Sequence, residues 1–262
     1  TADTSVKTIA HAVELADDGI GKIILLEGTH VLGTTLQITK DLDIRGIGDV
    51  VIDGNNNRFI QNGAGLNLTN IGFTNGYSSG SNLIYTSSDG KYLSLENVRF
   101  YKNSAKYGVS ASAGTRLIIN NSQFYDNNLF RANQNSLGVI YSNSAITTVE
   151  NTVFRNNTVQ KGAGIWANKA NSAQTGSVDV INCTFDGNVA QNGNGAAIFM
   201  SGSVIVNVVN STFTNNLANT SANHVGGYGS AVYIGTGTGK ITVSKSVFIN
   251  NTGNGENYND AG

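Results

Sequence analysis

One pattern, Asn-x-x-Phe-x-x-Asn, recurs along this chain and restricts the folds that it can adopt. Successive phenylalanines of the pattern are 24 to 35 residues apart. They are Phe73, Phe100, Phe124, Phe154, Phe185, Phe213 and Phe248. Self-similarity at such a period is typical of solenoids and propellers, in which each unit buries its apolar face only against its neighbours. The chain is therefore expected to form a stack of similar units.

Asparagine stands three residues before the phenylalanine in every unit but the last, where Lys245 takes its place. These asparagines are Asn70, Asn97, Asn121, Asn151, Asn182 and Asn210. Asparagine tolerates left-handed backbone angles, and its amide can bond the same group in the coils above and below. We therefore expect a bend at each asparagine and an amide ladder along the stack. The substitution Asn151→Leu is expected to leave buried partners unpaired.

Apolar and polar residues alternate just before each phenylalanine. Leu93 and Leu95, for example, flank Ser94, and the equivalent positions of the other units follow the same order with few exceptions. A period of two is that of a β-strand with one face turned inward. Stacked coils of such strands form a parallel β-helix, with about eight or nine coils by repeat counting.

A second strand in each coil precedes the first, and aromatic residues recur in it. In Gly164-Ile165-Trp166, an inward Ile165 would turn Trp166 outward. The outward column comprises Tyr85, Tyr141, Trp166, Phe199 and Tyr233. Rings supply contact area and neighbouring amides supply hydrogen bonds, so this column is the candidate ligand-binding surface for a glycan or a protein. In the alternative interpretation, loops cover the column and make it a small second core.

Composition excludes several classes of partner. Charged residues are 13% of the chain and the formal net charge is −1, which gives no basic footprint for nucleic acid and no polybasic segment for anionic lipid. No apolar run is long enough for a transmembrane helix. The single cysteine, Cys183, excludes an internal disulfide and falls among small inward residues. We expect no nucleic-acid partner, no membrane span, no cofactor and no metal.

The two ends of the chain differ. Residues 1–20 predict a capped amphipathic helix of about three turns, in which Asp3-Thr4-Ser5 precedes apolar residues at helical spacing. Such a helix would cover the apolar end and the strand edge of the first coil. Residues 253–262 show no similar cap. We therefore expect one β-helix domain over residues 1–262, with coils in residues 21–262, as a fragment of a larger protein.

Catalysis is the competing hypothesis, and it depends on carboxylates. Glycosidases on β-helices need two or three of them clustered on adjacent coils. Glu96 and Glu150 share a column, but Asn120 lies between them, which places them two coils, about 9.6 Å, apart. An exposed pair would lack the raised pKa that a catalytic acid needs. No column places aspartates in consecutive coils, as a calcium-dependent lyase would require. The sequence favours binding without catalysis.

The beginning of the chain resembles the start of a pectate-lyase-like right-handed β-helix, through Ile-Ile-Leu-Leu-Glu-Gly-Thr-His at residues 23–30, Leu-Asp-Ile-Arg-Gly at 42–46 and Val-Ile-Asp-Gly-Asn at 51–55. The repeats resemble those of polymorphic outer-membrane proteins and, more closely, of adhesin-like surface proteins of methanogenic archaea. The resemblance implies an extracellular position at the cell surface and attachment to a glycan or a surface protein of another cell. It leaves the oligomeric state open. The same fold hosts polysaccharide lyases and glycoside hydrolases, which is the alternative function.

Overall fold

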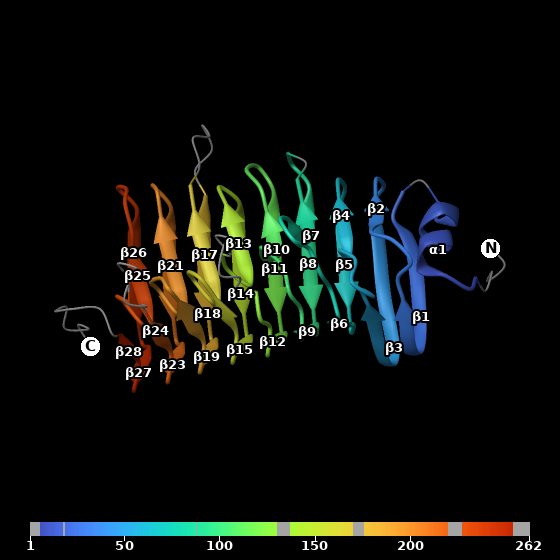
Figure 1. Cartoon of the computed structure of the whole chain (residues 1–262). Coiled ribbons are helices and arrows are strands. Elements are labelled where there is room, and N and C mark those ends of the chain that lie inside the picture. The colour runs from blue at the N-terminus through green and yellow to red at the C-terminus, as the bar shows by residue number, and fades with distance from the viewer. Residues whose placement is uncertain are drawn as a thin grey trace.

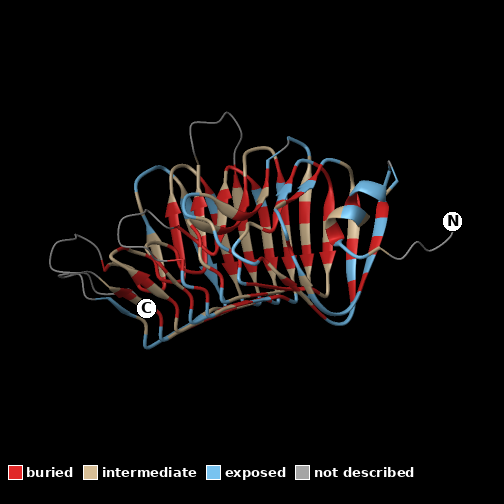
Figure 2. Ribbon diagram, turned by 45° about the vertical axis from the view of Figure 1, so that its right-hand side comes forward, coloured by how far each residue is buried: buried red, intermediate tan, exposed pale blue. Residues whose placement is uncertain are grey.

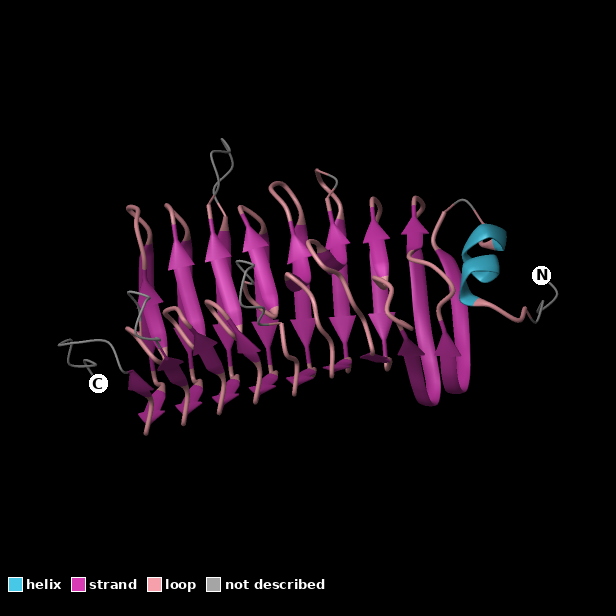
Figure 3. Ribbon diagram, viewed as in Figure 1, coloured by secondary structure: helices cyan, strands magenta, loops and turns pink. Residues whose placement is uncertain are grey.

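The computed structural model describes residues 6–17, 19–87, 89–129, 137–169, 176–219 and 227–253. They form an elongated parallel β-helix with a short helix at its N-terminal end (Figure 1, Figure 3). Three parallel sheets run along the body, with 16, 8 and 4 strands, here called sheets A, B and C. The predicted all-β class and the parallel β-helix are confirmed. The eight strands of sheet B agree with the expected number of coils.

Each coil contributes one strand to sheet B and two to sheet A. Sheet B comprises β2 (Leu36–Ile38), β4 (Ile60–Asn62), β7 (Asn82–Thr86), β10 (Tyr107–Ala111), β13 (Ile140–Asn143), β17 (Ile165–Asn168), β21 (Ile198–Ser201) and β25 (Val232–Ile234). One half of sheet A comprises β5 (Leu66–Thr69), β8 (Tyr92–Glu96), β11 (Arg116–Asn120), β14 (Ile146–Glu150), β18 (Ser177–Ile181), β22 (Ile205–Val209) and β26 (Lys240–Ser244).

The strands after the asparagine bend form the other half of sheet A. They are β6 (Gly72–Thr74), β9 (Arg99–Tyr101), β12 (Gln123–Tyr125), β15 (Val153–Arg155), β19 (Thr184–Asp186), β23 (Thr212–Thr214) and β27 (Val247–Ile249). The long strand β3 (Leu42–Asp53) belongs to both halves and pairs with β1 (Gly21–Val31). Sheet C comprises β16 (Thr158–Val159), β20 (Val189–Gln191), β24 (Leu217–Asn219) and β28 (Thr252–Gly253).

The asparagines before each phenylalanine occupy the bend between the two halves of sheet A. Their φ values lie between 49° and 57°, and Lys245 has 51° in the last coil. Their amides form two ladder segments and not one continuous ladder. Asn97 Nδ2 donates to Asn70 Oδ1 (2.9 Å), and Asn182 Nδ2 donates to Asn151 Oδ1 (2.6 Å). Between these segments, Asn121 Nδ2 donates to Glu96 Oε1 and Asn151 Nδ2 donates to Asn120 Oδ1. Asn151 is exposed, however. The expectation of buried partners at this residue was wrong, because the left-handed bend directs the side chain to solvent.

A second asparagine ladder lies inside the β-helix, three residues after each phenylalanine from Phe100 to Phe248. It consists of Asn103, Asn127, Asn157, Asn188 and Asn216, all buried, and the half-buried Asn251. Asn157 Nδ2 donates to the Phe124 carbonyl (2.9 Å) and to Asn188 Oδ1 (3.0 Å), and its Oδ1 accepts from Asn127 Nδ2 (2.8 Å). Every coil thereby satisfies its buried backbone through its neighbour.

The phenylalanines point inward from the strands that follow the bend, and the rings from Phe124 to Phe248 stack on one another. Six of them, from Phe73 to Phe213, are fully buried, and the ring centroids of Phe154 and Phe185 are 4.8 Å apart. This stack explains the glycine in the second-strand motif, because a Cβ on Gly164 would lie 2.7 Å from the Phe185 ring. Phe248 stacks on Phe213 at 4.7 Å but remains 38% exposed, since its coil has a described neighbour on one side only.

The N-terminal helix α1 (Ile9–Leu15) is shorter than the three turns predicted. It begins after Thr8, whose extended backbone and side-chain oxygen cap the first turn by accepting from His11 N. The expected cap at residues 3–5 lies outside the described residues. Ile9 and Val13 are buried and join the core of the β-helix, so the helix covers the first coil as expected. None of the described helices is long and apolar enough to cross a membrane.

Buried side chains line the inside of the coils along nearly the whole body (Figure 2). The alternation weakens in the last described coil, where Ile234 is 50% exposed and Val243 is 42% exposed. A solenoid coil buries its apolar face against both neighbours, and among the described residues this coil contacts only the preceding one.

Candidate functional site

Sheet B places the predicted aromatic column in register on its outer face. Tyr85 pairs with Ser110, which pairs with Tyr141, and the row continues through Trp166, Phe199 and Tyr233. The preceding residue of each strand points inward, and in β7, β10, β13, β17 and β21 it is fully buried. Side chains alternate across a strand, so the aromatic row faces outward. The structure thus brings these five residues together on one surface.

The rings contact one another along the row. The Tyr141 and Trp166 centroids are 4.8 Å apart, and those of Phe199 and Tyr233 are 5.6 Å apart. Tyr107, at the start of β10, stacks on Tyr141 at 4.6 Å. Sequence reasoning did not place Tyr107 in this group, because it stands three residues before the column position. The available sequence signal was that Tyr107 directly precedes Gly108-Val109, the second-strand motif of its coil.

Exposure along the row is uneven. Phe199 is only 7% exposed, and it lies between the Trp166 and Tyr233 rings, with Lys161 Nζ 5.9 Å from its centroid. Phe199 therefore supports its neighbours and offers little surface of its own. Tyr85, Tyr141, Trp166 and Tyr233 are half-buried. These four residues and Tyr107 are called the aromatic face below.

Hydrogen bonds fix two rings of the aromatic face at their polar ends. Asn168 Nδ2 donates to Tyr141 Oη (3.2 Å), and Trp166 Nε1 donates to Ser201 Oγ (2.9 Å). Ser201 Oγ in turn donates to Asn168 Oδ1 (2.8 Å), which joins both rings in one network. Asn168 Nδ2 also donates to Asn143 Oδ1 (3.0 Å). The two rings are consequently held in place before any ligand binds.

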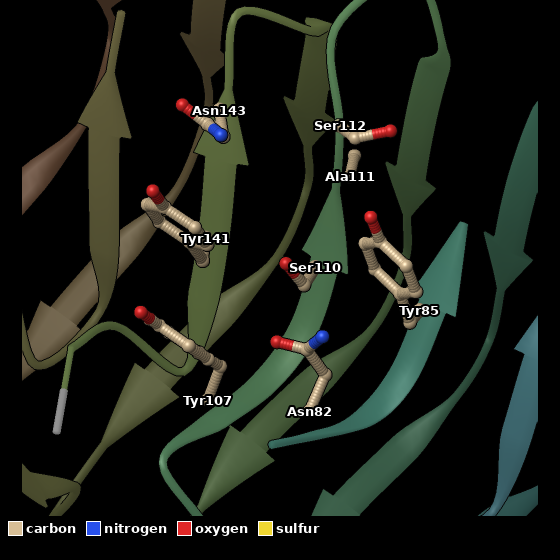
Figure 4. Close-up of a pocket in the computed structure, with 8 residues that line it drawn as sticks. All are labelled: Asn82, Tyr85, Tyr107, Ser110, Ala111, Ser112, Tyr141 and Asn143. Carbon is tan, nitrogen blue, oxygen red and sulfur yellow. The ribbon is translucent and has the colours of Figure 1, made fainter. Parts of the chain in front are cut away.

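A notch interrupts the aromatic face at Ser110, where a serine occupies the ring position. It has a volume of about 150 Å³. Its lining residues are Asn82, Tyr85, Tyr107, Ser110, Ala111, Ser112, Tyr141 and Asn143 (Figure 4). Figure 4 shows Ser110 at the centre, with Tyr85 on one side and Tyr107 and Tyr141 on the other. Burial raises the pKa of the Tyr107 and Tyr141 phenols, so these hydroxyls stay protonated and can donate hydrogen bonds at neutral pH.

The notch is smaller than the sites that hold drug-sized ligands, which span about 300–1,000 Å³. Its lining carries phenols, amides and hydroxyls but no charged side chain. Such a lining offers ring surfaces and neutral hydrogen-bonding groups close together. The notch could therefore hold one small polar ring.

The candidate catalytic carboxylates lie on a different sheet. Asn120 of β11 pairs with Glu96 on one side and with Glu150 on the other, so the two glutamates are two strands apart, as expected. Glu96 Oε1 accepts from Asn121 Nδ2 (2.7 Å). Both glutamates are half-buried on the outer side of sheet A.

No carboxylate extends this pair along the sheet. The register places Thr69 beyond Glu96 and Ile181 beyond Glu150. Within the described parts of the chain, no group of three or more His, Cys, Asp or Glu side chains has the arrangement to hold a metal ion. In this column of sheet A, the described residues thus provide two carboxylates that are two strands apart, with no carboxylate on the next strand on either side.

Cys183 is buried in the core, and its Sγ donates to the Val149 carbonyl (3.4 Å). Burial raises the pKa of this thiol to about 11. A nucleophilic cysteine requires a lowered pKa and access to solvent. Cys183 therefore acts as a small core residue.

Comparisons with known proteins agree with this architecture. A family model described as right handed beta helix region matches residues 59–222. The crystal structure of the catalytic unit of a thermostable GH87 alpha-1,3-glucanase from Streptomyces thermodiastaticus strain HF3-3 aligns with a TM-score of 0.50 and 16% identity. The alignment covers 92% of this chain and 52% of the glucanase unit, so the chain spans about half of that unit, and the likeness concerns the fold alone. A search of curated proteins found no match.

Proposed function

Since this chain belongs to the right-handed β-helix family, whose fold serves polysaccharide-degrading enzymes and adhesins alike, we propose that it is a non-catalytic adhesin module. Its ligand is a glycan, and its binding surface is the aromatic face on the outside of sheet B. The column predicted from the sequence, with Tyr107 added and Phe199 as a support, provides the contact area.

The network that joins Tyr141, Trp166, Asn168 and Ser201 is the observation that carries this proposal. Ordering a mobile side chain on binding costs about 0.5–1.5 kcal/mol. Rings that are already fixed avoid this cost. Their flat surfaces can contact the apolar faces of sugar rings, while the amides and hydroxyls between them bond sugar hydroxyls.

A position outside the cell is part of the proposal and follows from the resemblance to adhesin-like surface proteins. The partner is then a glycan on another cell or on its surface proteins. A stack of similar coils suits this role, because it repeats one surface along a rigid body and can contact several units of a polymer.

A polysaccharide lyase or glycoside hydrolase is the second candidate. The register of Glu96 and Glu150 favours it, because two strand spacings give about 9.6 Å, close to the range of about 6.5–9.5 Å for the carboxyl pairs of inverting enzymes. The glucanase of similar fold is consistent with it. The aromatic face, however, lies on sheet B, whereas these glutamates lie on sheet A.

A glycan-array screen tests the proposal. The protein is compared with the double variant Tyr141→Ala, Trp166→Ala and with a control that removes two other stacked rings, Tyr101→Ala, Tyr125→Ala. The control pair stacks at 5.1 Å, on β9 and β12 of sheet A. We expect glycan binding by the protein and by the control, and its loss in the aromatic-face variant. Equal loss in both variants, or retention in both, contradicts the proposed site.

Product assays on the bound polysaccharides separate binding from catalysis. New reducing ends would indicate a hydrolase, and unsaturated ends would indicate a lyase. The proposal predicts neither product. Turnover that disappears in Glu96→Gln or Glu150→Gln would establish the second candidate instead.

A further inference from the structure

Three cations lie along one edge of sheet B. Arg58 precedes β4, Lys106 precedes β10 and Lys161 precedes β17. The strands are parallel, so their starts lie at the same edge. The order β4-β7-β10-β13-β17 places the cations at alternate strands, about 9.6 Å apart at two strand spacings. These three residues are called the basic rim.

The basic rim adjoins the aromatic face. Lys106 Nζ lies 5.2 Å from the Tyr107 centroid. Arg58 Nε donates to the carbonyl oxygen of Asn82 (2.6 Å), a residue that lines the notch. Two of the three cations thus flank the notch.

The third cation continues the rim along the face. Leu137 N donates to the Lys106 carbonyl (3.0 Å), and Leu137 forms a parallel bridge with Lys161. Lys161 contacts Phe199, which supports the Trp166 ring. Leu137 therefore lies between Lys106 and Lys161 in neighbouring coils, and backbone pairing holds the two lysines on either side of it.

No carboxylate among the described residues neutralises the basic rim. The ion pairs of the described residues involve other cations. They join Glu14 to His11, Asp41 to Lys91 and Asp49 to Arg99. Asp89 follows β7 and so lies at the opposite end of the strands. The whole chain has a formal net charge of −1, so the positive charge at this edge is local.

We infer that the aromatic face binds an acidic polysaccharide, whose sugar rings lie on the tyrosines and Trp166 and whose carboxylate or sulfate groups meet Arg58, Lys106 and Lys161. This inference rests on the proposed glycan binding and specifies its substrate class. A neutral glycan would leave these three cations without an anionic partner. Cations at regular intervals suit a polymer whose negative charges also recur, and the uncharged notch between them suits a sugar ring.

Matched polysaccharides test the charge requirement. Polygalacturonate is compared with its carboxyl-reduced, neutral derivative, and dextran sulfate with dextran, which separates carboxylate from sulfate as the recognised group. Titrations are made at about 0.1 M and about 1 M NaCl, between which the Debye length falls from about 10 Å to about 3 Å. We expect at least one acidic polymer to bind about tenfold tighter than its neutral counterpart, and its advantage to shrink at high salt.

Two triple variants locate the effect. The rim variant is Arg58→Gln, Lys106→Gln, Lys161→Gln. The control removes the same charges from exposed cations elsewhere, Arg116→Gln, Lys22→Gln, Lys240→Gln. Since exposed ion pairs are individually weak, we expect the removal of all three rim charges to lower the affinity for the acidic polymer about tenfold and the control to lose almost none.

The outcomes separate this inference from the proposed function. Equal binding of acidic and neutral polymers, abolished by Tyr141→Ala, Trp166→Ala, would overturn the acidic ligand and leave the aromatic face as a glycan site. Equal weakening by the rim and control variants would mean attraction by charge alone, which also overturns the inference. Binding that persists in the aromatic variant would refute both proposals.

Discussion

The asparagine bends and the aromatic face are both columns of repeated residues, but the backbone depends on only one of them. The bend asparagines have φ values near 50°, and the inner asparagines bond buried carbonyls of neighbouring coils. The aromatic positions have no such role, because Ser110 takes the place of a ring within the same strand register. Since the fold does not require aromatic residues at these positions, their repetition favours a binding role for this surface.

The largest effect is expected for Asn157→Leu in the inner ladder. The substitution removes the hydrogen bonds that Asn157 Nδ2 donates to the Phe124 carbonyl and Asn188 Oδ1, and those that Asn157 Oδ1 accepts from Asn127 N and Asn127 Nδ2, all in a buried site. At about 1–3 kcal/mol for each unsatisfied group, the free energy of unfolding should fall by about 3 kcal/mol or more. Urea denaturation measures it. A loss below about 1 kcal/mol would mean that the inner ladder does not support the coil.

The next effect concerns function and not stability. Ser110→Tyr places a ring in the notch, at a position where the paired residues Tyr85 and Tyr141 already carry one. We expect the free energy of unfolding to change by about 1 kcal/mol at most, while glycan affinity falls about tenfold because the notch is filled. Calorimetric titration beside a melting curve measures both. Unchanged affinity would exclude the notch as part of the binding surface.

A smaller loss is expected at the exposed bend. Asn151 has a φ of 49°, so Asn151→Ala should cost about 1 kcal/mol through backbone strain. Asn151→Gly removes the same amide but tolerates the left-handed conformation, and it should cost less than alanine. Urea denaturation measures the free energy of unfolding of both variants. If glycine lowers it as much as alanine does, the hydrogen bonds of the Asn151 amide stabilise the bend, and the backbone angle does not.

The smallest effect is expected for Glu96→Gln and Glu150→Gln. Both side chains are half-buried on sheet A, and glutamine keeps the oxygen that accepts from Asn121 at the first site. The free energy of unfolding should stay within about 0.5 kcal/mol, and glycan binding should not change. Loss of affinity in either variant would move the site from sheet B to sheet A.

Much of the fold was predictable because one side-chain column maps to one place in every coil. The Phe154 column gave the period, and the alternation around Ser94 gave the inward face. The sequence could not show which asparagine ladder is buried, since Asn151 and Asn157 stand at equal distances from Phe154 and differ only in backbone angle. The described helix begins at Ile9 after a cap at Thr8, whereas the sequence placed the cap at residues 3–5, which lie outside the described residues.

The candidate site was predictable in register but not in exposure. The period placed Tyr141 and Trp166 on one face, but it did not show that Phe199 is buried, between the rings of the neighbouring coils and beside Lys161. Asn168 and Ser201 stand two residues after Trp166 and Phe199 and pair in neighbouring strands, so the repeat predicts that they are neighbours but does not predict the hydrogen bonds of their network. Tyr107 joined the face through a stacking contact that precedes the regular column position.

The fluorescence of Trp166 tests the central claim most directly, because Trp166 is the sole tryptophan of the chain and belongs to the aromatic face. A polysaccharide that binds in calorimetry is titrated while the tryptophan emission is recorded. The account predicts a saturable change in emission with the calorimetric midpoint, absent when Tyr141 is replaced by alanine. Binding in calorimetry with an unchanged Trp166 emission would contradict it, and would place the ligand on another surface of the β-helix.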